Sequence, residues 1–268
     1  MFSRRNFRYV LVLALAWISV QWSGCGRSKL SITLAGSTAF QPFAEKLAEQ
    51  FMALRPEVNI TVQGGGSAVG IQSAISGAAQ VGMADLVDLP EEAKALYSTV
   101  VARDGISIVV HPSNPVADLT LDQIRKIFSG TIRAWNGVGG TDSPITVVSR
   151  ESGSGTRSSF EQIVREIHLP ADAIIQSSNG TIRETVANDR NAVGYLSHGL
   201  LNERIKALRV GGIDCTVQTI KKGRYPLVRP VFLLTREKPE GAVADFIAYI
   251  LSAPGQNTIE NSGLIGAE

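Results

Sequence analysis

Three short loops rich in glycine, serine and threonine are the features of this sequence that could do chemistry. They are Gly36-Ser37-Thr38, Gly64-Gly65-Gly66-Ser67 and residues 150–157, whose sequence is RESGSGTR. Small residues let the backbone come close to a ligand. A helix that begins directly after such a loop presents unpaired N–H groups and the positive end of its dipole. This arrangement suits the binding of an oxyanion.

The elements around the three loops indicate how the loops could be brought together. Apolar runs at residues 31–35, 58–63 and 145–148 precede the loops, and amphipathic helical patterns follow them. Open α/β sheets bind ligands at the carboxyl ends of neighbouring strands, so three helix N-termini could converge on one anion. Each loop taken alone is better explained as a helix cap, and only the joint pattern favours a site.

Length and composition describe a globular protein with substantial cores. The chain has 268 residues, of which 44% are hydrophobic and 19% charged. That length allows one large domain or two modest ones. Strand-like runs alternate with helical patterns along the chain, which indicates α/β architecture.

Residues 1–24 predict an export signal. Arg4, Arg5 and Arg8 precede an apolar stretch at residues 9–20, and small residues follow, as in a secretory leader. The paired arginines also fit a twin-arginine leader, the less favoured route. Removing residues 1–24 takes away three arginines and no acidic residue, so the formal net charge changes from +2 to −1. A mature chain without a basic excess or a Lys/Arg tract argues against a nucleic-acid partner.

The residues after the leader predict a lipid anchor. Trp22-Ser23-Gly24-Cys25 resembles a bacterial lipobox, in which the cysteine becomes the lipidated first residue, although Trp22 stands where that motif prefers Leu. We therefore expect lipidation at Cys25 and a periplasmic or cell-surface location. Cys215 then has no cysteine partner and is expected to be a buried, small apolar residue. Trp135 is likewise expected to pack in a core.

Two proline-containing segments suggest how the chain divides. Residues 111–115 (HPSNP) follow one buried-looking strand, and residues 225–230 (YPLVRP) precede another. Such segments could be a pair of hinge crossings between two lobes. The prediction is a discontinuous first lobe of residues 31–112 plus 217–268 and a second lobe of residues 113–216, with the ligand held in the cleft between them.

The most specific stretch of the sequence is residues 119–130 (LTLDQIRKIFSG), which continues through Trp135-Asn136 to the third loop. Together with the second loop, Gly82-Met83-Ala84-Asp85 and residues 225–230, it resembles the phosphate-binding protein of the Pst-type ABC transporter, in its shorter form. The resemblance covers essentially the whole mature chain. It implies a two-lobed, hinged periplasmic-binding-protein fold of type II. It also implies an exported, high-affinity, non-enzymatic monomer that delivers inorganic phosphate to membrane ABC permease subunits.

The resemblance also implies a set of ligand residues. Carried over position by position, the family's phosphate contacts fall on Thr38, Ser67, Asp85, Arg150, Ser154, Gly155 and Thr156. The sequence departs from the family at Ala68, where relatives often have Gly, and at Ala39, where larger members have Phe. The contributing backbone amides near Ala39 and Ala68 are therefore left open, as is the role of Arg157.

These residue types suit phosphate. Phosphate at neutral pH keeps a proton that an ionised Asp85 can accept, whereas sulfate has no proton to offer and would meet like-charge repulsion. Arg150 can give two parallel, charge-assisted hydrogen bonds. The alternatives are a surface Arg150 paired with Glu151 and an Asx-turn role for Asp85. Hydroxyl donors to the other ligand oxygens are expected from Thr38, Ser67, Ser154 and Thr156.

Other classes of site lack the residues that they need. The three histidines, His111, His168 and His198, do not share metal-ligand spacing, and no lysine follows a glycine-rich loop as in a Walker A motif. The third loop lacks the flanking pattern of a nucleophile elbow. We therefore expect no cofactor, no metal and no catalysis. The alternatives kept open are a binding protein for sulfate, molybdate or an organophosphate, a phosphate-sensing surface protein, and a phosphate-ester hydrolase.

Overall fold

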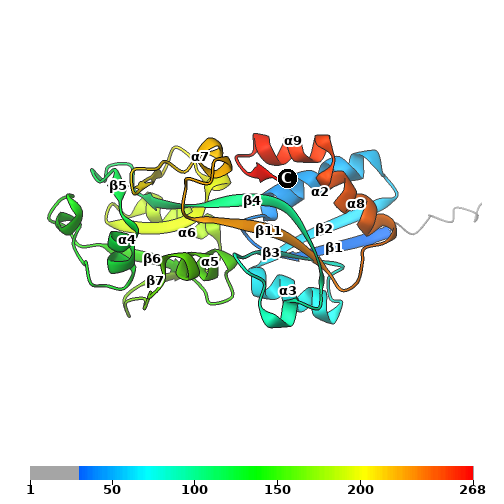
Figure 1. Cartoon of the computed structure of the whole chain (residues 1–268), viewed down its shortest axis with the longest axis horizontal. Coiled ribbons are helices and arrows are strands. Elements are labelled where there is room, and N and C mark those ends of the chain that lie inside the picture. Colours follow the sequence, from blue (N-terminus) through cyan, green and yellow to red (C-terminus); the bar gives the residue numbers. More distant parts are fainter. Residues whose placement is uncertain (1–29, 268) are drawn as a thin grey trace, which may run out of the picture.

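Two groups of strands and helices lie at opposite ends of an elongated molecule, and two long strands run between them (Figure 1). The computed structural model describes residues 30–267, so the predicted export signal and Cys25 lie outside the described residues. Within residues 30–267, no helix has the length and apolar character needed to cross a bilayer.

The first group, called the first lobe below, begins with the strand–loop–helix order that the sequence predicts. Its elements are β1 (Leu30–Gly36), α2 (Gln41–Leu54), β2 (Val58–Gly65), α3 (Ser67–Ser76), β3 (Val81–Asp85), η1 (Glu91–Ala93), α8 (Gly241–Leu251), α9 (Ala253–Asn261) and β12 (Ile265–Gly266). β1 lies between β2 and β3 and is parallel to both, with Leu30 opposite Val58 and Leu34 opposite Val81. The carboxyl ends of these strands therefore point the same way.

The second group, called the second lobe, also alternates strands and helices. Its elements are β5 (Asp118–Leu119), α4 (Leu121–Phe128), η2 (Trp135–Val138), β6 (Thr146–Arg150), α5 (Gly155–Val164), β7 (Ile174–Gln176), α6 (Asn179–Asn188), β8 (Ala192–Ser197), η3 (His198–Leu200), β9 (Lys206–Ala207), β10 (Arg209–Val210) and α7 (Val217–Lys221). β6 is parallel to β7 on one side and to β8 on the other.

β4 (Tyr97–Val110) and β11 (Val228–Thr235) join the two lobes. β4 pairs antiparallel with β11 between residues 97 and 105, and it pairs antiparallel with β8 over residues 106–110. One sheet therefore runs through the molecule in the order β2-β1-β3-β11-β4-β8-β6-β7. Gly105 lies at the change of partner, where a Cβ would stand 2.6 Å from Cys215 Sγ and 2.7 Å from Ile220 Cδ1. Glycine at this position lets α7 pack closely on the crossing.

Each lobe has its own core. In the first core, Phe51 packs on Phe246 with ring centroids 5.2 Å apart. In the second core, Phe160 stacks on Tyr195 at 4.1 Å. Trp135 is buried in that core, and its indole N–H donates to Asn191 O at 3.0 Å. Cys215 is buried there too, and burial raises the pKa of its thiol to about 12, so the thiol is neutral near pH 7.

The lobe boundaries stay a prediction, and the cores bear on where to draw them. Ile106 and Val110 of β4 belong to the second core, as do Ile220 and Leu227, whereas Val101 belongs to the first. We therefore propose that the first crossing lies in β4 near residue 105 rather than after residue 112. On the same ground, residues 217–227 go with the second lobe.

Candidate anion-binding site

The candidate site lies where the two lobes face each other. The loop after β1, the start of α3 and the end of β3 reach it from the first lobe, and the loop between β6 and α5 reaches it from the second. Helices α3 and α5 stand on the same side of the long strands (Figure 1). The structure brings together in these segments all the residues predicted as ligands: Thr38, Ser67, Asp85, Arg150, Ser154, Gly155 and Thr156.

The lobes contact each other directly at this point. The amide of Ala68 donates to Gly153 O at 3.1 Å, which links the first turn of α3 to the third loop. A Cβ on Gly155 would stand 2.1 Å from Ser67 Oγ and 2.6 Å from Asp85 O. α5 therefore begins this close to the first lobe because residue 155 has no side chain. A groove of about 170 Å³ lies beside this contact and is lined by Ser67, Ser154 and Gly155, among other residues.

Asp85 is buried and already accepts three side-chain donors. Its Oδ1 accepts from Ser67 Oγ at 2.7 Å. Its Oδ2 accepts from Thr156 Oγ1 at 3.3 Å and from Arg229 Nη1 at 2.5 Å. All three contacts use the carboxylate oxygens as acceptors. The hydroxyls of Ser67 and Thr156, expected to donate to a ligand, donate here to Asp85.

Arg150 is also buried, with 1% of its surface exposed. Its Nε and Nη2 donate to the carboxylate of Glu151 at 2.9 and 2.8 Å, and Nη2 donates to Thr38 Oγ1 at 3.2 Å. The pairing with Glu151 is thus present, although Arg150 does not lie at the surface. Its Nη1 is buried and has no partner within residues 30–267. One nitrogen of this guanidinium therefore remains available to an anion.

Thr38 is oriented by two donors from the second lobe. Its Oγ1 accepts from Arg150 Nη2 at 3.2 Å and from Asn179 Nδ2 at 3.3 Å. A hydroxyl accepts two hydrogen bonds and donates one, so Thr38 is left with its O–H to donate. Asn179 was not predicted as a site residue. Its only local signal is the capping box of Ser178 and Thr181 at the start of α6.

The third loop caps α5 and holds the segment that carries Arg150. Ser154 is the N-cap of α5 and its Oγ accepts from Arg157 N at 3.2 Å, which leaves the hydroxyl proton free to donate. Arg157 pairs with Glu161 at 2.7 Å and donates to Arg150 O at 2.8 Å. Arg157 therefore supports the loop that carries Arg150.

Which backbone amides near Ala39 and Ala68 contribute was left open, and the amides of these two residues already have partners in the protein. Ala39 N donates to Ser37 Oγ at 3.2 Å, and Ala68 N donates to Gly153 O. Ser37, rather than an anion, therefore satisfies the first of these amides, and contact between the lobes satisfies the second.

Arg229 and Asp104 form a buried ion pair behind Asp85 that sequence reasoning missed. Arg229 Nη2 donates to Asp104 Oδ2 at 2.9 Å, and both residues are at most 1% exposed. Ser197 Oγ donates to the other Asp104 oxygen at 2.9 Å. The sequence does carry a signal for this ion pair. Arg229 is a charged residue inside the apolar run 227–234, and a buried charge must be paired.

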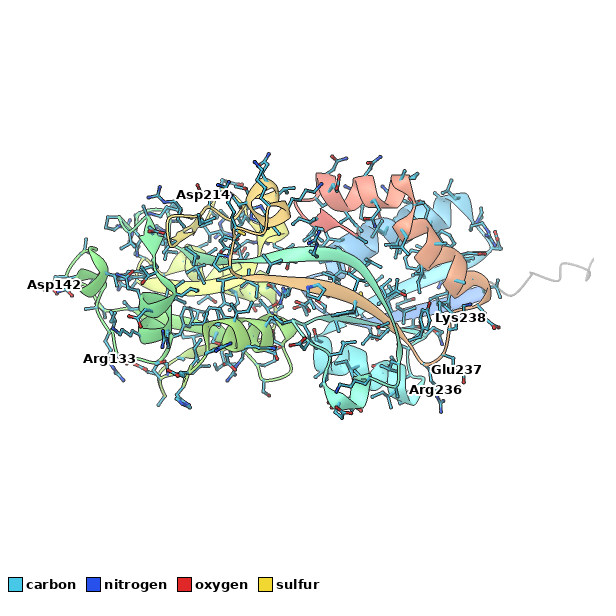
Figure 2. All side chains as sticks on the ribbon, viewed as in Figure 1. Arg133, Asp142, Asp214, Arg236, Glu237 and Lys238 are labelled. Carbon is cyan, nitrogen blue, oxygen red and sulfur yellow. The ribbon has the colours of Figure 1, made fainter. Side chains whose placement is uncertain are left out.

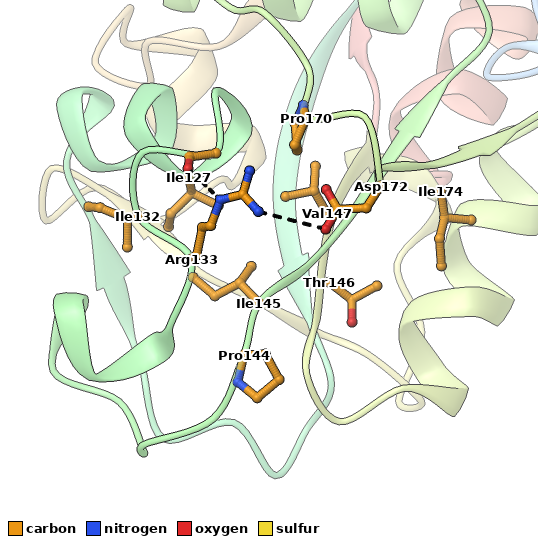
Figure 3. A pocket seen from close by; sticks show the side chains of 11 residues that line it. Ile127, Ile132, Arg133, Pro144, Ile145, Thr146, Val147, Pro170, Asp172 and Ile174 are labelled. Carbon is orange, nitrogen blue, oxygen red and sulfur yellow. Dashed lines mark hydrogen bonds and ion pairs between the residues drawn. The ribbon is translucent and has the colours of Figure 1, made fainter.

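A second pocket, of about 390 Å³, lies on the second lobe and apart from the candidate site. Figure 3 shows its apolar wall, which includes Ile127, Ile145 and Val147, and the ion pair that Arg133 and Asp172 form at 4.0 Å. None of the predicted ligand residues lines it.

Exposed charges of both signs occur together outside the cleft. Figure 2 shows Arg133 and Asp142 at the outer end of the second lobe, and Arg236, Glu237 and Lys238 at the outer end of the first. Neither group is a basic cluster of the kind that binds nucleic acid. Within residues 30–267, no group of three or more His, Cys, Asp or Glu side chains could hold a metal ion.

The chain is similar to known proteins over most of its length. Residues 23–254 match a family model described as a PBP superfamily domain. The phosphate-binding protein PstS of Bacillus subtilis is 34% identical over 233 residues, which cover 85% of this chain and 78% of that protein. The phosphate-binding protein PstS of Borreliella burgdorferi is 26% identical and covers 88% of this chain and 89% of its own.

Solved structures resemble the molecule across both lobes. One is a putative phosphate ABC transporter substrate-binding protein with bound phosphate from Clostridium perfringens. It is 37% identical, has a TM-score of 0.86, and covers 89% of this chain and 100% of its own. An ABC-type phosphate transport receptor from Vibrio cholerae is 34% identical, with a TM-score of 0.74, and covers 88% of this chain and 100% of its own.

Proposed function

The chain belongs to the PstS family of phosphate-binding proteins, within the PBP superfamily, and on that basis we propose that it captures inorganic phosphate between its lobes and delivers it to a membrane ABC permease. The relative from Clostridium perfringens, which has phosphate bound, supports the ligand. That protein and the one from Vibrio cholerae are both named as parts of phosphate transport systems, which supports the partner.

The observation that carries the proposal is a buried cation and a buried anion in one cleft. Arg150 Nη1 is a buried donor without a partner among the described residues, and it can give charge-assisted hydrogen bonds to ligand oxygens. The oriented hydroxyl of Thr38 and the first turn of α5, which begins at Gly155, add further donors.

Asp85 supplies the means of choosing phosphate over sulfate. A carboxylate has about four lone-pair sites, and Ser67, Thr156 and Arg229 occupy three of those on Asp85. The remaining site can accept the proton that phosphate keeps at neutral pH. Sulfate has no proton to donate, so this lone-pair site of Asp85 would stay unpaired and face an anion, at a cost of about 1–3 kcal/mol. Discrimination thus comes from a penalty on the wrong ion.

We also propose that residues 1–24 export the chain and that Cys25 carries a lipid anchor, so that the protein works outside the cytoplasm. Membership of a solute-binding family supports export, and the lipobox-like sequence supports the anchor. Mass analysis of the mature N-terminus tests both proposals. A chain that begins at an unmodified residue would contradict the anchor.

Phosphate binding is best measured by calorimetry, because Trp135 is buried in the second core and would report ligand binding poorly. We expect saturable binding of one phosphate per chain with a dissociation constant below about 10 μM, and no matching signal with sulfate. Equal affinity for sulfate would indicate a binding protein for another oxyanion. Absence of saturable phosphate binding below the millimolar range would contradict the proposed function.

A further inference from the structure

A closed ring of hydrogen bonds runs behind the candidate site and through both crossing strands. Its members, in order, are Asp85, Arg229, Asp104, Ser197, Asn179 and Thr156. Each of them is at most 1% exposed. The ring therefore links the carboxylate of the site to the strands that join the lobes without contact with bulk water.

Arg229 and Asp104 occupy the crossing itself. They stand directly opposite each other in the antiparallel pairing of β11 and β4, one position from Gly105 and Val228. Arg229 Nη1 reaches Asp85 at 2.5 Å, and Nη2 reaches Asp104 at 2.9 Å. One guanidinium is thus shared between a carboxylate of the candidate site and a carboxylate of the crossing.

Two buried carboxylates that share one cation depend on that cation to remain ionised. Burial raises the pKa of Asp104, and the positive charge of Arg229 works against the rise. Within residues 30–267, the only ion pair of Asp85 is the one with Arg229. A buried carboxylate that loses its counter-charge takes up a proton, because burial disfavours the charged form.

We propose that Arg229, clamped by Asp104, is a specificity-determining positioning residue: it holds Asp85 as an anion, so the exclusion of sulfate depends on the crossing strands. This inference rests on the proposed function. Arg229 acts through Asp85 and is not assigned a ligand contact. Without Arg229, a protonated Asp85 becomes a donor, and a donor favours sulfate.

The other groups around Asp85 do not replace Arg229. Ser67 and Thr156, from α3 and α5, are uncharged, and Arg150, from the end of β6, is paired with Glu151. His198, in η3, lies near Asp104. Burial lowers its pKa, against the opposing charge of Asp104, so it is neutral near pH 7.

The test is the sulfate affinity of the double variant Arg229→Met with Asp104→Asn, measured by calorimetry at several pH values from 5 to 9. Removing both charges together avoids leaving Asp104 buried and unpaired, and Arg229 Nε has no partner to lose among the described residues. Sulfate has no proton to lose in this range, so its affinity reports the protein alone. Arg55→Gln with Asp245→Asn is the matched control, since it removes an exposed Arg–Asp pair of the first lobe.

We expect the double variant to bind sulfate at least about tenfold more tightly than wild type near pH 6. The gain should fade as the pH rises, because a carboxyl group that loses its proton can no longer donate. The control pair should behave as wild type. A ratio of phosphate affinity to sulfate affinity equal to that of wild type at every pH would overturn the inference. This holds whether both affinities stay unchanged or both fall. Failure of wild type to bind phosphate would instead overturn the proposed function.

Asp104→Asn alone gives a second test that does not depend on folding of the double variant. Without the Asp104 carboxylate, Asp85 is the only ion-pair partner of Arg229 among the described residues. The variant should therefore continue to exclude sulfate at a lower pH than wild type does. Weaker exclusion of sulfate than in wild type would overturn the inference.

Discussion

At the scale of single residues, the site depends on which hydrogen-bonding groups are already used. Glu151 holds Nε and Nη2 of Arg150, and Nη1 has no partner among the described residues. The hydroxyls of Ser67 and Thr156 already donate their hydrogen bonds to Asp85. The groups left for an anion are therefore fewer than a count of polar side chains suggests, and each has a defined role as donor or acceptor.

Arg150→Lys tests whether Arg150 holds Glu151 and a ligand oxygen at the same time. Lysine keeps the charge and loses the planar fork, so it cannot hold Glu151 and a ligand oxygen together. We expect phosphate affinity measured by calorimetry to fall about tenfold to a hundredfold, which corresponds to the loss of a charge-assisted hydrogen bond. Arg133→Lys, at an exposed residue of the second lobe, is the matched control. A fall smaller than about twofold would argue against a ligand role for Arg150.

At the scale of elements, the start of α5 makes one of the contacts between the lobes. Ser154 caps the helix, and Gly155 lies against Ser67 and Asp85 of the opposite lobe. The same residues thus end a loop, begin a helix and complete the cleft.

Gly155→Ala tests the close contact between the lobes. The alanine Cβ would stand 2.1 Å from Ser67 Oγ and 2.6 Å from Asp85 O, so the variant should disfavour the closed arrangement. We expect phosphate affinity to drop at least about tenfold. Gly180→Ala, in the first turn of α6, is a matched control because its Cβ would meet nothing closer than Ser178 Oγ at 3.6 Å. Equal affinities of the two variants would contradict the close contact.

At the scale of the whole molecule, one sheet passes through both lobes, so relative motion of the lobes must be absorbed where β4 and β11 cross. Ligand binding that needs groups from both lobes shifts the population towards the closed arrangement. Backbone amides that donate across the cleft report that shift directly.

Hydrogen exchange at two amides tests the closure. Ala68 N donates to Gly153 O, and Val87 N donates to Ser159 Oγ. Saturating phosphate should slow exchange at both by about tenfold or more, because both bonds exist only when the lobes meet. The amide of Leu208, which donates to Ile108 O inside the second lobe, should change little. Equal slowing at all three would indicate general stabilisation instead of closure.

Local patterns predicted most elements near the site. Runs at residues 31–35, 58–63 and 145–148 correspond to β1, β2 and β6, because each alternates or concentrates apolar residues. The first half of β4 was missed, since Arg103 and Asp104 interrupt the apolar pattern that marks a buried strand. α6 was missed as well, and with it Asn179, because only Ser178 and Thr181 mark its start.

The sequence by itself determined the three loops and the residue types of the candidate site, which stays a prediction, because glycine, hydroxyl and helix-start signals lie within a few positions of one another. Only the tertiary structure decided which groups are already paired. Arg229 pairs with Asp104, which lies 125 positions away in the chain, and Arg150 donates to Thr38, which lies 112 positions away. Periodicity reports neighbours along one element, whereas the partner of a buried charge depends on how distant strands pack.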